Sequence, residues 1–134
     1  MERGEHWLWR LDAGAWLRAA QVELDACAAH IASRRTSVTH ARRAAGMALN
    51  AVLTGLPDGE TRWGRSYLEH LQALTRGPTD PLPDEMRAAA TTLLAIVPVA
   101  PPGLVTLARG PHAAADDALA AARALVAACA ALVG

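Results

Sequence analysis

The chain has 134 residues, of which 52% are apolar and only 4% aromatic, and thirteen basic residues balance thirteen acidic ones. This length fits one domain, and the zero net charge excludes binding of nucleic acid or an anionic membrane through a global electrostatic field. The many alanines favour closely packed helices and disfavour an all-β fold. We therefore predict an all-α protein with a single helical-bundle domain over residues 1–134.

A long first helix is predicted from Trp9 to Ile31. Apolar residues recur there every three or four positions, as on the buried face of a helix of roughly seven turns. The stripe consists of Trp9, Ala13, Trp16, Ala20, Leu24, Cys27 and Ile31. We expect this helix to need packing partners along its whole length.

The second predicted helix contains HARRAAGMALNAVL, from His40 to Leu53. Serines interrupt the apolar pattern over residues 33–37, and Ser37 or Thr39 is expected to cap the new helix. Small residues on this helix allow its neighbours to approach closely. We therefore expect it to occupy the centre of the fold.

Three more helices complete the expected fold. The third runs over residues 65–75, the fourth runs from a cap at Asp84 to Val97, and the last begins near His112 or Ala113. Proline-rich connections separate these helices. Their expected buried residues are Tyr67, Leu68, Leu71 and Leu74, then Met86, Ala89, Ala90, Leu93, Leu94 and Val97, and finally Leu119, Ala122, Leu125, Val126, Cys129, Leu132 and Val133.

Cysteine usage and the two ends of the chain indicate a cytoplasmic protein that does not cross a membrane. Cys27 and Cys129 lack CxxC spacing and fall on predicted helix faces, so we expect reduced, buried thiols. The start, MERGEHWLWRLD, has no uninterrupted apolar run and is not a secretory signal. The apolar run after Arg123 has only about ten residues, whereas a spanning helix needs about 20.

Together these segments predict an up-and-down four-helix bundle with a short additional helix. The first helix has a Trp-containing start, the next two contain ARRAAGMALNAVL and WGRSYLEHLQAL, and a proline-rich loop precedes the last. In this order and spacing the chain resembles the HEPN domains, small prokaryotic helical bundles of the type paired with minimal nucleotidyltransferases. The resemblance implies a HEPN-like fold, a homodimer, and a nucleotidyltransferase-type protein as a candidate partner.

The resemblance also raises the question of catalysis, because such families include ribonuclease toxins whose active site is an Arg and a His four to six residues apart. Two matches occur, Arg35 with His40 and Arg65 with His70, but in neither is the residue after the Arg an Asn, Asp or His. Five residues along a helix turn two side chains about 140° apart, which separates Arg65 from His70. We therefore assign no catalytic residue. These two pairs remain the candidates for the alternative function, a metal-independent endoribonuclease toxin of a toxin–antitoxin pair.

A basic cluster is the candidate binding site for a nucleotide or RNA. It comprises Arg34, Arg35, His40, Arg42 and Arg43. Its guanidinium groups gather around a helix N-terminus, where free backbone N–H groups already favour phosphate. The structural alternative is that the arginines of this cluster pair with Glu23, Asp25 or other carboxylates on adjacent helices.

The sequence contains no motif that calls for a metal or a cofactor, and we expect neither. It lacks a Glu-x-x-His pair, a P-loop, GxGxxG and GxSxG. The terminal run ALVAACAALVG is apolar around much of its circumference, which favours contact with a second protomer. The predicted function is therefore a non-catalytic, homodimeric HEPN-like module that binds a nucleotide, RNA or a nucleotidyltransferase partner.

Overall fold

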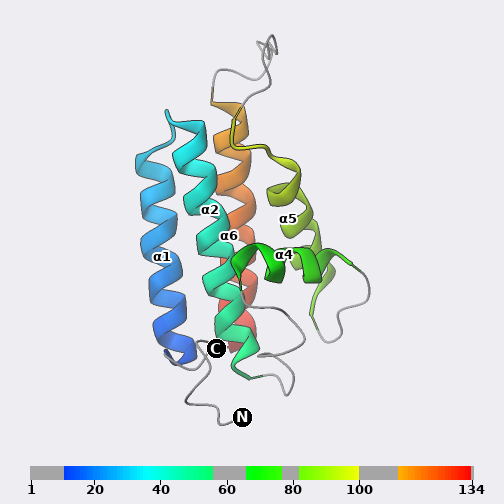
Figure 1. Ribbon diagram of the computed structural model, residues 1–134. Coiled ribbons are helices and arrows are strands. Elements are labelled where there is room, and N and C mark those ends of the chain that lie inside the picture. The colour runs from blue at the N-terminus through cyan, green and yellow to red at the C-terminus, as the bar shows by residue number, and fades with distance from the viewer. Residues whose placement is uncertain (1–10, 56–65, 77–81, 100–111, 134) are drawn as a thin grey trace.

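The structure, a computed structural model, describes residues 11–55, 66–76, 82–99 and 112–133. Within these ranges the chain forms five helices and no strand: α1 (Ala13–Ala29), α2 (Arg34–Leu53), α4 (Tyr67–Thr75), α5 (Asp84–Ala95) and α6 (Ala113–Val133). The longer helices α1, α2, α5 and α6 alternate in direction, and the short α4 lies across the others (Figure 1). The prediction of an all-α helical bundle is confirmed.

Helix α2 occupies the centre of the fold, as predicted, and contacts each of the other four helices. Twelve of its 20 residues are buried. Many of them are alanines, which let the neighbouring backbones approach closely. The closest approach is at Gly46, where a Cβ atom would overlap with the Tyr67 side chain of α4. Gly46 therefore sets the point at which α4 crosses α2.

Helix α1 is shorter than the predicted first helix, which was expected to reach from Trp9 to Ile31. It begins at Ala13 because the Asp12 carboxylate caps it, accepting a 2.8 Å hydrogen bond from the backbone N–H of Ala15. It ends at Ala29, and Ile31 packs against the core from beyond the helix. Trp9 lies outside the described residues. The buried stripe from residue 16 to residue 27 is confirmed.

Helix α2 begins earlier than predicted. Its N-cap is Ser33, whose Oγ accepts from the backbone N–H of Thr36, so the expected break over residues 33–37 is wrong. Ser37 and Thr39 lie inside the helix, where their hydroxyls donate to carbonyls three and four residues earlier. Such bonds satisfy a hydroxyl within a helix. As a result Arg34 and Arg35 lie in the first turn of α2.

The remaining helices differ from the prediction mainly at their ends. Helix α4 begins at Tyr67 after the cap Ser66, α5 ends at Ala95 rather than at Val97, and Asp84 is the first residue of α5 and not its cap. Four residues predicted to be buried are exposed: Leu68, Val97, Leu132 and Val133. Leu68 lies on the outer side of a short crossing helix, and the other three lie at or beyond the ends of helices, where fewer neighbours cover them.

The core confirms the predicted state of the cysteines, since Cys27 and Cys129 are both free and buried. Burial raises the pKa of the Cys129 thiol to about 12. Within the described ranges, no helix has both the length and the apolar character needed to cross a membrane.

Candidate functional site

The predicted basic cluster divides into two groups. The first group, Arg34 and Arg42, donates hydrogen bonds to backbone carbonyls at the end of α5. Arg34 Nε donates a 2.8 Å hydrogen bond to the carbonyl of Val97. Arg42 donates to the carbonyl of Leu93 from Nε and Nη2, and from Nη2 to the carbonyl of Ile96 at 2.6 Å. The last carbonyls of a helix have no partner within it and carry its negative dipole end, so guanidinium groups suit them. Burial lowers the pKa of Arg42.

The second group faces solvent. Arg35, Thr39 and Arg43 are exposed and lie four residues apart on α2, so they form one row along the helix. The helical rise separates the Cα atoms of Arg35 and Arg43 by about 12 Å. The Arg35 guanidinium group has no hydrogen-bond or ion-pair partner within the described ranges. Arg43 Nε lies 3.5 Å from Glu23 Oε1, yet its side chain remains 48% exposed.

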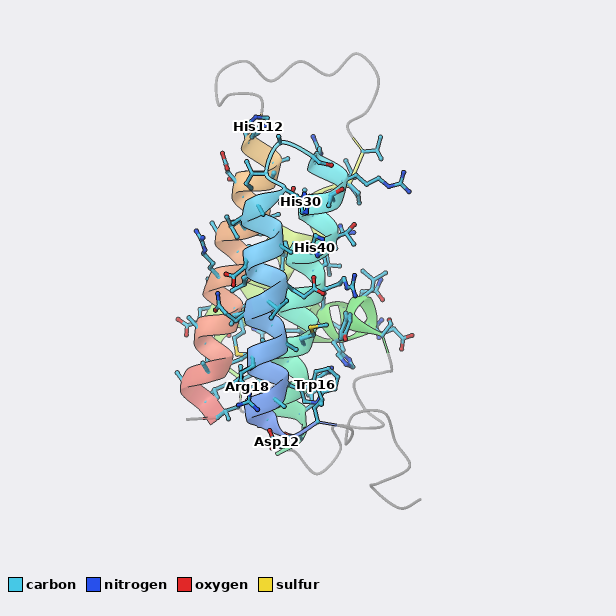
Figure 2. The ribbon with its side chains drawn as sticks, turned by 90° about the vertical axis from the view of Figure 1, so that its left-hand side faces the viewer. Asp12, Trp16, Arg18, His30, His40 and His112 are labelled. Carbon is cyan, nitrogen blue, oxygen red and sulfur yellow. The ribbon has the colours of Figure 1, made fainter. Side chains whose placement is uncertain are left out.

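His40 lies beside this row and is held by Glu23 of α1. Its Nδ1 donates a 2.5 Å hydrogen bond to Glu23 Oε2, and the two side chains are only 23% and 13% exposed. A neutral imidazole that donates from Nδ1 keeps Nε2 as an acceptor. The rings of His30 and His40 stack, with centroids 5.8 Å apart (Figure 2). The orientation of His40 is therefore fixed from two sides.

The structural alternative, in which the arginines pair with carboxylates, is confirmed within the described residues for Arg43 alone. Glu23 binds both His40 and Arg43, whereas Asp25 accepts a 3.0 Å hydrogen bond from Gln21 on its own helix. One carboxylate thus serves two basic side chains. Positive charge therefore remains exposed to solvent in the row of α2 that contains Arg35 and Arg43.

Tyr67 is a member of this site that the sequence did not reveal. Burial raises the pKa of its hydroxyl; the positive charge of Arg43 opposes the rise and the negative charge of Glu23 adds to it. The phenol therefore stays neutral near pH 7 and can donate a hydrogen bond. Its position depends on the crossing of α4 over α2 at Gly46. A glycine in the middle of a helix is the one sequence signal that indicates this close approach.

The two predicted Arg–His pairs are placed differently. Arg35 and His40 both lie on α2, so the five-residue spacing turns them about 140° apart. Arg43 is three residues after His40 and shares a helix face with it. Arg65 lies outside the described residues, and His70 of α4 is fully buried.

A cavity of about 420 Å³ lies at the end of the bundle where α1 begins and α2 and α6 end. Its lining is mostly apolar and includes Ala13, Val52, Leu82, Leu132 and Val133. Over the described part of the chain, no group of three or more His, Cys, Asp or Glu residues is arranged to hold a metal ion.

Comparison with known proteins adds no function to this geometry. No family model matches the chain, and neither a curated protein nor a solved structure matches it. The function is therefore argued from the residues and their arrangement.

Proposed function

We propose that the protein is a non-catalytic binding module, a HEPN-like homodimer with an up-and-down four-helix bundle and the short α4. Its exposed face of α2 binds the phosphate groups of a nucleotide or RNA. Arg35 and Arg43 make the principal contacts, and His40 lies beside Arg43. A nucleotidyltransferase-type protein is the expected partner of such a module.

The observation that supports this function is that the arginines of α2 fall into two groups with different surroundings. Arg34 and Arg42 bind the carbonyls at the end of α5, while Arg35 and Arg43 face solvent in one row of α2. The Cα atoms of Arg35 and Arg43 are about 12 Å apart along the helix, a spacing that suits a ligand with several phosphate groups. Guanidinium groups recognise phosphate oxygens through paired hydrogen bonds.

Two neighbours of the row favour a nucleotide over a simple anion. Tyr67 lies close enough to Arg43 to sense its charge and supplies the aromatic ring that the basic cluster itself lacks. The stacked pair His30 and His40 adds two further rings near the row. Bases of single-stranded RNA stack on such rings.

One observation favours a second candidate function, the metal-independent endoribonuclease. The hydrogen bond from His40 Nδ1 to Glu23 leaves Nε2 free to accept a proton, and Arg43 lies on the same face. In this function His40 removes the proton of a 2′-hydroxyl as its oxygen attacks the adjacent phosphorus. The bond from phosphorus to the 5′-oxygen breaks, that oxygen takes up a proton from solvent, and Arg43 stabilises the charge on the non-bridging phosphate oxygens. In that case Arg35 contributes to RNA binding and not to catalysis.

Fluorescence anisotropy with a short labelled single-stranded RNA tests the binding site. We expect Arg35→Ala and Arg43→Ala each to weaken binding about tenfold, since each removes a charge-assisted contact. The matched control is Arg76→Ala, which removes an exposed arginine at the end of α4. Equal losses in all three variants, or no binding by the wild type, would contradict the proposed site.

Incubation of the protein with the same RNA in the presence of a metal chelator distinguishes a binding module from a metal-independent endoribonuclease. Intact RNA supports the binding module. Cleavage by the wild type that is lost in His40→Gln overturns the non-catalytic assignment and supports the endoribonuclease.

A further inference from the structure

The outward face of α1 carries an exposed apolar side chain between two charges. The exposed residues of this helix are Arg18, Gln21, Val22, Asp25, Ala28 and Ala29. Val22 is 67% exposed, more than any other large apolar side chain in the described ranges. It lies in the middle of α1 and not at a frayed end. Single exposed apolar side chains are common on protein surfaces, so the charges beside Val22 decide what this face can bind.

The charges on either side of Val22 are not neutralised within the protomer. In the described part of the chain neither Arg18 nor Asp25 has an ion-pair partner, and Asp25 accepts a hydrogen bond only from Gln21. Arg18 and Asp25 are seven residues apart, which is two helical turns, so they share one face. Val22 lies between them on that same face.

Helix α6 packs beside α1 and continues the surface with small residues (Figure 2). Its exposed positions beyond the first turn are Ala120, Arg123, Ala124, Ala127, Ala130, Ala131, Leu132 and Val133. Arg123 is the one charged side chain among them. Alanine faces allow a second helix layer to approach closely.

We infer that the face formed by α1 and α6 binds a second copy of this chain, with the two α1 helices antiparallel about a two-fold axis that passes level with Gln21 and Val22. This inference rests on the homodimer in the proposed function and assigns its interface. In an isologous interface each contact occurs twice. Arg18 faces Asp25 of the partner subunit, and Asp25 faces Arg18 of the partner subunit. The two Val22 side chains meet close to the axis.

Charge complementarity selects this arrangement. A parallel pairing in the same register would place Arg18 against Arg18 and Asp25 against Asp25, and like charges repel. The antiparallel pairing forms two opposite-charge contacts around an apolar centre. The face also leaves the α2 row free, so dimerisation and phosphate binding use separate surfaces.

Light scattering coupled to size-exclusion chromatography of the full chain tests this interface. The wild type is expected to be a dimer at micromolar concentration. Val22→Glu, Arg18→Glu and Asp25→Arg should each weaken dimerisation at least about tenfold, because each brings like charges together. The double variant Arg18→Glu/Asp25→Arg should restore the dimer. The control, Glu85→Arg, reverses an exposed charge on α5 and should leave the dimer unchanged.

Each other outcome contradicts a defined part of the inference. A monomeric wild type overturns this interface together with the homodimer. A dimer that tolerates all three single variants overturns the interface alone. If the single charge reversals weaken dimerisation and the double variant does not restore it, the antiparallel register is wrong. Circular dichroism confirms that each variant is folded, and RNA binding by Arg35 and Arg43 is measured independently of all these results.

Discussion

Asn50 is a buried polar residue whose amide has no partner in the described part of the structure. It lies in the second half of α2 and is fully buried, and neither its Nδ2 nor its Oδ1 makes a hydrogen bond there. An unpaired buried amide costs about 1–3 kcal/mol. We predict that Asn50→Leu raises the free energy of unfolding by about 1 kcal/mol, measured by urea denaturation. A lower stability would show that the amide is bonded in the native protein.

Gly46 is the residue on which the crossing of α2 and α4 depends. A methyl group there would overlap with Cβ, Cγ and Cδ1 of Tyr67. We predict that Gly46→Ala lowers the free energy of unfolding by about 2 kcal/mol, since overpacking outweighs the better helix propensity of alanine. Urea denaturation measures the change.

Gly14 of α1 provides the matched control for this substitution. A Cβ atom there would meet only the flexible end of Arg18, at 3.3 Å, and the side chain of Asp12. Gly14→Ala should therefore be neutral or slightly stabilising. Equal destabilisation by the two substitutions would contradict the role assigned to the α2–α4 crossing.

The buried thiol of Cys129 predicts a loss of stability at alkaline pH. Burial raises its pKa from 9.0 to about 12, so the unfolded chain releases the thiol proton at a lower pH than the folded chain. The stabilising contribution is complete below pH 9 and is lost as the pH rises toward 12. We predict that the free energy of unfolding falls over this range less steeply in Cys129→Ala than in the wild type. Identical slopes would contradict the burial of the thiol.

At the scale of helices, the end of α5 depends on Arg42 of α2. Its guanidinium group donates to the carbonyls of Leu93 and Ile96. We predict that Arg42→Met lowers the free energy of unfolding by about 2 kcal/mol, since it leaves partly buried carbonyls unpaired. Amide hydrogen exchange should increase first in the last turn of α5.

Arg35→Met is the control on the same helix. The Arg35 side chain is exposed and has no partner within the described ranges, so its replacement should change stability by less than about 0.5 kcal/mol. If both substitutions destabilise the protein equally, Arg42 has no special role at the end of α5.

Helix formation and burial could be predicted from the sequence because they depend on local periodicity. The buried stripe of α1 and the central position of α2 follow from apolar spacing and small residues. The start of α2 was misplaced because Ser37 was interpreted as a helix cap. Its hydroxyl bonds instead to a carbonyl of the same helix, and both uses of a serine look alike in a sequence.

The candidate site was only partly predictable, because its contacts join distant segments. The pairing of Glu23 with Arg43 was among the predicted alternatives, whereas its hydrogen bond with His40 was not predicted. No local pattern indicates that Arg34 and Arg42 bind carbonyls more than 50 residues away. The same limit applies to Tyr67, whose place beside Arg43 depends on how α4 crosses α2.

At the scale of the whole molecule, the surfaces of the helices differ in what they contact. The buried faces of α1, α2, α4, α5 and α6 form the core. Of the remaining surfaces, the basic row of α2 is the proposed site for phosphate groups, and the α1–α6 face is the proposed contact with a second protomer. A local row of arginines is compatible with the zero net charge of the whole chain.

A heteronuclear NMR titration of the full chain with single-stranded RNA tests the central claim most directly, because it maps the contact surface residue by residue. The proposed function predicts that the largest shifts occur along α2 from Arg35 to Arg43 and at Tyr67, and that they weaken as salt is added. Shifts confined to the apolar cavity at the end of α6, or no shifts at millimolar RNA, would contradict it.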